Sequence, residues 1–282
     1  MTYPIVLSYI QTDQLRDAKR KGQSSLEISP DLGLSTVTVT LTLEGVTFPD
    51  GIHLSWQHIE KISKAQVNCF LVEDNSIKSI QVFSETTNRV CSLMPTKGAP
   101  SMLIAGFVMH RIKDIDPLQD TLRKIAAIPP ITGRVLDTAT GLGYTAIEAA
   151  KTAGEVVTIE LDPGAQEIAR LNPWSRGLFT GANIHQIMGD AYEVVPTFED
   201  ESFTRIIHDP PTFSLAGDLY SGAFYQQLYR ILKRGGRLFH YIGDPNSKAS
   251  GGVTKGVLRR LSEAGFTRVV RKPEAYGVVA YK

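Results

Sequence analysis

The chain has 282 residues, of which 42% are hydrophobic, and a formal net charge of +1 at pH 7. That composition is typical of an ordinary soluble globular protein with one large domain or two. The charge excludes a global electrostatic attraction to nucleic acid, so any such attraction requires a local basic patch.

The chain has two cysteines and six histidines, and neither residue type shows the spacing of a metal site. Cys69 and Cys91 are therefore expected to be reduced, mostly buried thiols, and no metal is expected. The N-terminus lacks the basic-then-apolar plan of a signal peptide, and no apolar run approaches the roughly 18 residues of a membrane span. A cytoplasmic location and no membrane partner are the resulting expectations.

Residues 1–98 are predicted to form a small β-rich domain. Residues 36–43 alternate threonine with valine or leucine, ending at Leu43, which is typical of a half-buried antiparallel strand with its apolar residues inward. The rest of this domain is expected to be a short helix and three further groups of short strands, at residues 54–65, 69–72, 77–83 and 89–93.

Residues 94–100 are rich in proline and glycine and are predicted to link this domain to a second one, residues 99–282. Asp116 and Pro117 supply an N-cap and a first-turn proline for a helix through residue 128. The consecutive prolines Pro129 and Pro130 end that helix.

Residues 134–150 begin with a short apolar run, break at Gly141 and Gly143, and continue as a helix-forming segment. This order is strand, glycine turn and helix, the start of a βαβ unit. The next apolar run ends at Glu160, about 20 residues beyond the turn, where a carboxylate accepts hydrogen bonds from both hydroxyls of a ribose.

Two cofactor classes use this geometry, and Asp137 distinguishes them. A carboxylate before the glycines repels the pyrophosphate of a dinucleotide, which would otherwise bind at the helix N-terminus. The same charge attracts the ammonium and sulfonium groups of S-adenosylmethionine. The segment from Asp137 to Gly143 resembles the first motif of class I methyltransferases, and Glu160 resembles their ribose-binding acid.

This resemblance implies an α/β fold with a Rossmann-like seven-stranded sheet that ends in an antiparallel hairpin. The remaining strands are expected at residues 184–191, 203–208 and 237–242, and the hairpin at 267–271 and 276–281. Asp190 either lies beside the adenine, as in this family, or caps a short helix, and the two roles are compatible. The residues expected to bind S-adenosyl-L-methionine are Asp137, Thr138, Ala139, Gly141, Gly143, Glu160, Leu161, Asp190 and Ala191.

The fourth strand leads directly into Asp209, Pro210, Pro211, Thr212 and Phe213. Two prolines make a rigid turn, and such a turn at the carboxyl edge of the sheet lies beside the cofactor crevice. The segment resembles the Asp-Pro-Pro-aromatic motif of methyltransferases that modify exocyclic amines, which implies catalytic roles for Asp209, Pro210, Pro211 and Phe213.

The motif departs from the usual pattern because Thr212 occupies the fourth position and the aromatic residue, Phe213, comes one later. It is also similar to the motif of rRNA methyltransferases that modify a ring nitrogen of guanine. Residues 94–282, with their Met109-His110-Arg111 and Asn172-Pro-Trp-Ser segments, resemble an archaeal-type methyltransferase family similar to enzymes that dimethylate the N4 amine of an rRNA cytidine. The segment at Met109 either reaches the methionine end of the cofactor or is a strand that joins the domains.

Two basic clusters bear on the partner, and each is either a solvated helix face or a contact with a polyanion. From Lys248 onward the chain carries eight basic residues against Glu263 and Glu274. The resemblance of the Asp-Pro-Pro segment implies RNA, ribosomal RNA in particular, as the substrate, with the N4 amine of cytidine as the leading acceptor. The alternatives are guanine N7, a small molecule or protein, a non-catalytic RNA-binding module, and a dehydrogenase. The oligomeric state is not predicted. The two clusters are Arg16, Lys19, Arg20 and Lys21, and Lys255, Arg259 and Arg260.

Overall fold

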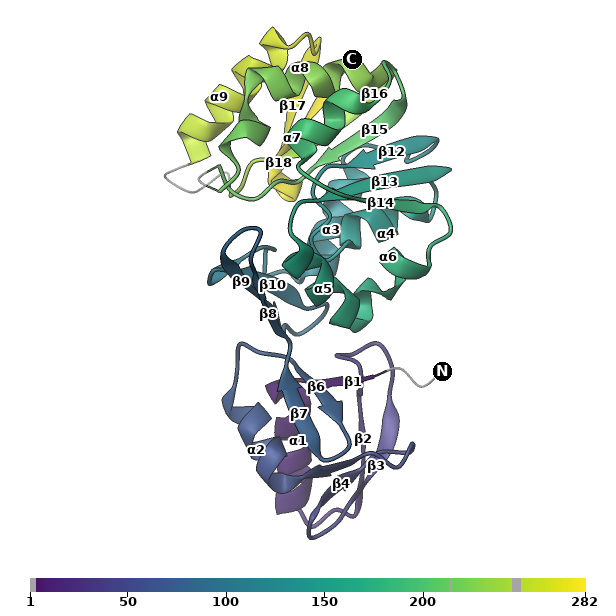
Figure 1. Cartoon of the computed structure of the whole chain (residues 1–282), viewed down its shortest axis with the longest axis vertical. Helices are drawn as coiled ribbons and strands as arrows, with labels where there is room; N and C mark the ends of the chain where they lie inside the picture. The colour runs from purple at the N-terminus through teal and green to yellow at the C-terminus, as the bar shows by residue number, and fades with distance from the viewer. Residues whose placement is uncertain (1–3, 214, 245–249) are drawn as a thin grey trace. The chain divides into compact units, whose positions relative to one another are not determined.

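The computed structural model describes residues 4–213, 215–244 and 250–282 (Figure 1). The described chain forms two compact units, Met1–Leu118 with Gly164–Arg176, and Gln119–Pro163 with Gly177–Lys282. The predicted division into domains 1–98 and 99–282 stays a prediction about which parts fold on their own. Ser214, which ends the Asp-Pro-Pro segment, and Lys248 lie outside the described residues.

The first unit is rich in short antiparallel strands, as its alternating sequence predicts. Three sheets have the orders β1-β6-β7, β2-β3-β4-β5 and β11-β10-β9-β8, and helices α1 and α2 accompany them. The elements are β1 (Ile5–Leu7), α1 (Tyr9–Arg20), β2 (Ser25–Ile28), β3 (Val37–Leu41), β4 (Gly45–Thr47), β5 (His53–Ser55), α2 (Trp56–Lys64), β6 (Phe70–Glu73), β7 (Ser76–Ser79), β8 (Gln81–Ser84), β9 (Arg89–Met94), β10 (Ser101–Ile104) and β11 (Phe107–Val108).

The core of this unit comes from the predicted apolar faces. Val39 of β3 and Ile59 and Ile62 of α2 are fully buried. The expectation that Leu43 points inward is wrong, because this side chain is 99% exposed. Strand β3 ends at Leu41, and the Thr42 amide then donates to the Gly45 carbonyl, so a turn replaces the strand before residue 43.

Strand pairing bears on two sequence interpretations in this unit. Strands β9 and β10 are antiparallel partners, so the segment predicted as a linker connects a hairpin. The Met109 amide donates to the Met102 carbonyl, which continues the pairing of β10 with β11.

The early basic cluster is a largely paired helix face. On α1, Arg16 forms ion pairs with Glu60 at 2.7 Å and Asp13 at 3.3 Å, and Arg20 pairs with Asp17. Lys19 lies 4.2 Å from the centroid of the Trp56 ring. These local partners offset the positive charge, which favours the solvated-face interpretation.

The second unit is built on a seven-stranded sheet with the order β14-β13-β12-β15-β16-β18-β17. Strands β14, β13, β12, β15 and β16 are parallel, whereas β18 runs antiparallel to both of its neighbours. This is the predicted Rossmann-like sheet with a terminal antiparallel hairpin. Its strands are β12 (Arg134–Asp137), β13 (Glu155–Glu160), β14 (Ile184–Met188), β15 (Phe203–His208), β16 (Leu232–Tyr241), β17 (Arg268–Lys272) and β18 (Gly277–Tyr281).

Helices α7, α8 and α9 share one apolar core with the sheet, in which Phe224, Leu228 and Leu261 pack with Leu136 and Ile206. Strand β16 is longer than predicted, because it begins at Leu232 instead of residue 237. The helices along this part of the chain are α3 (Pro117–Ala126), α4 (Tyr144–Ala150), α5 (Pro163–Leu171), α6 (Arg176–Thr180), α7 (Ala191–Val194), α8 (Gly222–Ile231) and α9 (Ser250–Glu263).

Candidate functional site

The candidate site lies at the carboxyl edge of the seven-stranded sheet. From β12 the chain proceeds outward to β13 and β14, and then returns to β15 on the other side of β12. This reversal makes a switch point between β12 and β15, the place where open α/β sheets bind their ligands. Asp137, Glu160 and Asp209 all stand at or directly after the carboxyl ends of these strands.

Asp137 ends β12 and is fully buried. Its Oδ2 accepts hydrogen bonds from the Thr145 hydroxyl at 3.0 Å and the Thr158 hydroxyl at 2.9 Å. Burial raises the pKa of Asp137 to about 7, although the two hydroxyls oppose the shift by stabilising the charged form. Its other oxygen, Oδ1, is buried without a hydrogen-bond partner among the described residues.

The glycine turn is tied to the strands on both sides of β12. The Thr138 amide donates to the Ile207 carbonyl of β15 at 3.0 Å, and the Thr140 amide donates to the Ile159 carbonyl of β13 at 2.9 Å. The turn is therefore held in place before any ligand arrives. Ala139, between these two anchors, is partly exposed.

Glu160 joins the glycine turn to the end of β13. Its Oε2 accepts a hydrogen bond from the Gly141 amide at 2.8 Å, and its Oε1 accepts one from the Asp162 amide at 2.9 Å. Burial raises the pKa of Glu160 to about 7, against the effect of these amides. Each carboxylate oxygen has a second lone pair, so Glu160 keeps acceptor capacity for a ligand.

Different structural constraints require glycine at the two positions of the turn. Gly141 and Gly143 both have left-handed backbone, with φ of 53° and 76°. A Cβ at Gly141 would meet no atom within 4 Å, whereas one at Gly143 would lie 2.7 Å from Cδ2 of Leu178. The open space at Gly141 lets a ligand approach the backbone, and Gly143 permits the packing of α4.

The remaining predicted cofactor residues lie near the ends of β13 and β14. Leu161, directly after Glu160, is 48% exposed, and Ala191 is buried. Asp190 is exposed and accepts a hydrogen bond from the Tyr192 amide at 2.8 Å, so it caps α7 as one of its two predicted roles requires.

These residues fit S-adenosylmethionine. The unpartnered Oδ1 of Asp137 suits a cationic group, and the acceptor capacity of Glu160 suits ribose hydroxyls. The exposed Leu161 offers an apolar surface to a planar ring. The assignment of each residue to the cofactor stays a prediction.

The Asp209 carboxylate has an ion-pair partner that the sequence did not predict. Its Oδ2 lies 2.6 Å from Nζ of Lys124, on helix α3. Burial raises the pKa of Asp209, and the positive charge of Lys124 opposes that shift. Lys124 also pairs with Asp120 at 2.8 Å, and its Nζ lies 4.6 Å from the centroid of the Tyr241 ring.

The turn after Asp209 is braced by Tyr220. The Tyr220 hydroxyl donates to the Pro211 carbonyl at 3.0 Å, and the ring packs edge-on against Phe213 with centroids 5.5 Å apart. Tyr220 is buried, whereas Phe213 is 52% exposed. Phe213 therefore presents an accessible aromatic face from a supported position.

Two buried histidines beneath this turn were not predicted from the sequence as part of the site. His208 Nε2 donates to the Leu219 carbonyl at 2.9 Å, so its Nδ1 accepts from the Thr138 hydroxyl at 2.7 Å. Burial lowers the pKa of His208 to about 4, and it lowers the pKa of His240, whose ring centroid is 4.4 Å away. Both rings are neutral near pH 7. His208, which directly precedes Asp209, connects that turn to Thr138 of the cofactor turn, and His240 pairs with the Tyr225 hydroxyl at 2.8 Å. An alternating strand pattern gives no signal for such a pair.

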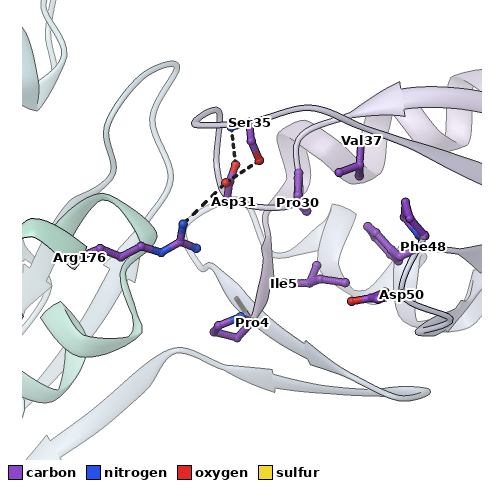
Figure 2. Close-up of a pocket in the computed structure, with 10 residues that line it drawn as sticks. Pro4, Ile5, Pro30, Asp31, Ser35, Val37, Phe48, Asp50 and Arg176 are labelled. Atoms are coloured by element: carbon purple, nitrogen blue, oxygen red, sulfur yellow. Dashed lines mark hydrogen bonds and ion pairs between the residues drawn. The ribbon is translucent and has the colours of Figure 1, made fainter. Parts of the chain in front are cut away.

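A pocket of about 250 Å³ lies within the first unit (Figure 2). Asp31 accepts hydrogen bonds from the Ser35 amide at 2.8 Å and the Ser35 hydroxyl at 2.7 Å, and it lies 4.0 Å from Arg176. The charges of Asp31 and Arg176 thus offset each other. The rest of the lining is largely apolar, as with Ile5, Val37 and Phe48.

Comparisons with known proteins show the family to which the chain belongs. Residues 135–236 match the family described as "Methyltransferase domain". Across the whole chain, 40% of residues are identical to the uncharacterized protein MJ1233 of Methanocaldococcus jannaschii, over 288 residues that cover 100% of this chain and 98% of that protein. The chain belongs to the family of MJ1233.

Solved structures share the fold of this MJ1233-family chain. Spermidine synthase from Thermotoga maritima is similar with a TM-score of 0.56 and 19% identity, over 73% of this chain and 75% of that one. A spermidine synthase in complex with the transition state analogue AdoDATO gives 0.58 and 21%, over 73% and 76%. At these identities the likeness shows the fold alone and does not name an acceptor.

The matched domain and the topology support an S-adenosylmethionine-dependent class I methyltransferase. Within the described ranges, no helix has both the length and the apolar character needed to cross a membrane. The same ranges contain no group of three or more His, Cys, Asp or Glu residues that could hold a metal ion.

Proposed function

We propose that this protein transfers a methyl group from S-adenosylmethionine to a nitrogen of an RNA base, and that the acceptor is the N4 amine of a cytidine in ribosomal RNA. The observation that carries the proposal is the ion pair between Asp209 and Lys124 at the carboxyl edge of the sheet. Oδ2 of Asp209 lies 2.6 Å from Nζ of Lys124. Strand β12 lies between β15, which leads into Asp209, and β13, which ends at Glu160. The cofactor turn lies at the same edge.

An ionised carboxylate accepts hydrogen bonds and cannot donate one. It therefore favours an acceptor that brings an N–H group, as an exocyclic amine does. The N7 atom of guanine offers only a lone pair, so a carboxylate anion repels it. Asp209 thus supports the amine over guanine N7, the runner-up from the sequence.

The amine of cytosine is a poor nucleophile because its lone pair is delocalised into the ring. A hydrogen bond to Asp209 favours the pyramidal nitrogen that attacks and stabilises its growing positive charge. The sulfonium supplies an activated methyl group when the cofactor is bound. As the new N–C bond forms, the C–S bond breaks with its electron pair on sulfur, and Asp209 accepts the proton that the nitrogen loses. The raised pKa of Asp209 suits that proton transfer.

Phe213 provides the second element of the acceptor site. A base must leave its stack to reach an active site of this kind, and an aromatic ring then replaces the lost stacking. The exposed face of Phe213, supported by Tyr220, is available for that contact.

Exposed basic side chains on α9 and a lysine at the end of β17 support a polyanionic substrate. Lys255 and Arg259 are exposed on one face of α9, and Arg259 is partly offset by Glu263 at 3.7 Å. Arg260 is turned away from that face and interacts with Tyr225, so it is not part of the predicted cluster. Lys272, which ends β17, lies in register with Gly277 and through it with Tyr241 of β16. Phosphate contacts at such positions fix the register of the RNA.

The test is methyl transfer from labelled cofactor to undermodified ribosomal RNA, followed by digestion to nucleosides. Label in N4-methylcytidine supports the proposal, and label in N7-methylguanosine supports the runner-up. Label only in protein or a small molecule refutes an RNA acceptor. Cofactor binding with no transfer to any substrate would indicate a non-catalytic module. The Asp209→Asn variant in the same reaction is the matched control, because it keeps the size of the side chain and removes its charge.

A further inference from the structure

Helix α3 places two charged side chains in the interior at a spacing of four residues. The side chain of Asp120 is fully buried, and that of Lys124 is 3% exposed. Their closest charged atoms are 2.8 Å apart, and Lys124 Nζ reaches onward to Asp209 Oδ2 at 2.6 Å. One ammonium thus bridges two carboxylates, and the Asp209 carboxylate is the more exposed of the two at 20%.

Stability is a weak explanation for this arrangement. Removing charges from water costs several kcal/mol per ion, and a buried ion pair often contributes no more than apolar residues of the same volume. One ammonium beside two carboxylates also leaves the cluster without charge balance. The glycine turn and Glu160 have separate hydrogen bonds, so cofactor binding does not account for the cluster either.

What the arrangement does is fix one oxygen of Asp209. A contact of 2.6 Å between Lys124 and Oδ2 holds the carboxylate by a single oxygen, leaving Oδ1 for another partner. Lys124 itself is fixed by Asp120 on the preceding helical turn and by the Tyr241 ring on β16. An anchor built from two elements restricts the rotation of Asp209, the kind of support that catalytic positioning requires.

We propose that Lys124 is a positioning residue for methyl transfer, which holds the Asp209 carboxylate in place for the acceptor amine and favours its charged form, with Asp120 fixing Lys124. This proposal rests on the proposed function of Asp209. Under this proposal, helix α3 helps to select an acceptor that carries an N–H group, although it lies outside the sequence motifs at the strand ends.

The proposal sets the direction in which two substitutions move the pH profile. Lys124→Met removes the positive charge, so Asp209 holds its proton to higher pH and the acidic limb of kcat moves up. Asp120→Asn removes a negative charge that raises the pKa of Asp209, so the acidic limb moves down. The other titratable groups that interact with Asp209 are Tyr220 and Asp137, and Tyr241 lies against Lys124; both substitutions leave these three groups in place.

The experiment measures kcat against pH for the wild type and four variants, with saturating cofactor and the RNA acceptor. Lys124→Met should reduce kcat about 10²-fold near neutral pH, the effect of a misplaced catalytic group, and Lys124→Arg should restore part of it. Arg123→Met is the matched control, because Arg123 is the exposed neighbour on the same helix and should leave the profile unchanged. Asp120→Asn keeps the size of the side chain and remains informative if Lys124→Met does not fold.

Carboxyl NMR of Asp209 in the cofactor-bound protein gives a second readout that needs no acceptor. Opposite displacements of its titration in Lys124→Met and Asp120→Asn are expected, and coincident titrations would overturn the proposal. If the wild type methylates cytidine and the pH profiles of kcat coincide in all variants, the proposed role of Lys124 is overturned and the proposed function still stands. If the wild type methylates no base, the proposed function fails, and the NMR titration still decides whether Lys124 controls Asp209.

Discussion

The Gly141 amide donates a 2.8 Å hydrogen bond to Oε2 of Glu160, and this contact joins the glycine turn after β12 to the end of β13. A motif and an acid that are 19 residues apart in sequence thereby become one rigid surface. The Gly141 amide fixes the orientation of the Glu160 carboxylate, whose remaining lone pairs can accept hydrogen bonds from a ligand.

Glu160→Ala should weaken the binding of S-adenosylmethionine by about 1–3 kcal/mol, because two ribose hydroxyls lose their acceptor. The Gly141 and Asp162 amides lose theirs too, so Glu160→Gln should show a smaller loss. Isothermal calorimetry measures both affinities. Glu199→Ala removes an exposed carboxylate and should bind as the wild type does. An unchanged affinity in Glu160→Ala would contradict the assignment.

Cofactor affinity should rise with pH near neutrality. The pKa of Asp137 is raised to about 7 by burial, so the side chain is neutral below that pH and anionic above it. The anion attracts the cationic cofactor, so Kd should fall as the pH rises through 7, by up to about tenfold per unit below the pKa. Titration calorimetry at a series of pH values measures this trend.

Asp137→Asn should flatten that dependence, and the part that remains reports Glu160, whose pKa is also about 7. S-adenosylhomocysteine is the matched ligand control, because its thioether lacks the sulfonium charge. Its affinity should depend less on pH than that of the methyl donor. An equal dependence for the two ligands would show that Asp137 does not sense the cofactor charge.

Much of this sheet edge could be predicted from the sequence because its signals are local. The glycine turn, the acid about 20 residues later and the Asp-Pro-Pro segment each follow an apolar run, so their places at strand ends follow from the chain order. The seven strands and the reversed terminal hairpin were expected from the family resemblance, whereas the strand order was not predicted. The observed sheet has both the seven strands and the antiparallel hairpin.

The ion pair of Lys124 with Asp209 could not be predicted, because 85 residues separate its members. Lys124 stands in an amphipathic helix where a solvated lysine is the ordinary interpretation. The Asp120 and Lys124 spacing of four residues is a local signal, but it is also typical of exposed helix pairs. The outward turn at Leu43 was missed for a related reason, since alternation predicts faces only as far as the strand extends.

Gly143→Ala should destabilise the fold more than Gly141→Ala. Both positions have left-handed backbone, which costs a residue with a Cβ about 1–2 kcal/mol. Only the Cβ at Gly143 meets a neighbour, Cδ2 of Leu178 at 2.7 Å, and overpacking of this kind costs about 1–3 kcal/mol more. Urea unfolding measures both losses. In a Leu178→Ala background the extra cost of Gly143→Ala should shrink, and an unchanged cost would place the strain elsewhere.

Phe213→Ala should raise KM for the RNA acceptor about tenfold or more, since stacking of a base on an aromatic ring contributes about 1–3 kcal/mol. Phe213→Tyr keeps the ring and should retain a KM near the wild-type value. Phe107→Ala removes another exposed phenylalanine, on β11, and serves as the control for lost surface area. Steady-state kinetics with the RNA substrate decides the point. Equal KM values for the Phe213→Ala and wild-type proteins would rule out stacking on this ring.

Asp209 should affect turnover far more than cofactor binding, because its carboxylate follows β15 and is held by Lys124, whereas the ribose acid Glu160 ends β13. Asp209→Asn keeps an acceptor oxygen but removes the charge, and its kcat should fall about 10²–10³-fold, the usual cost of losing one group that stabilises transition-state charge. Asp209→Ala should lose at least as much. Calorimetry should find the cofactor affinity of both variants close to that of the wild type.

The values of kcat and of the cofactor Kd together show on which side of the site Asp209 acts. A fall in kcat with unchanged cofactor Kd places Asp209 on the acceptor side of the site. A parallel loss of both would mean that removing the carboxylate disturbs the sheet edge, as an unpaired Lys124 would do. Lys124→Met combined with Asp209→Ala removes both charges and separates these cases: restored cofactor affinity without restored turnover is expected if the ion pair is structural support and Asp209 acts on the acceptor. Near-wild-type kcat in Asp209→Asn would show that the transfer does not use this carboxylate.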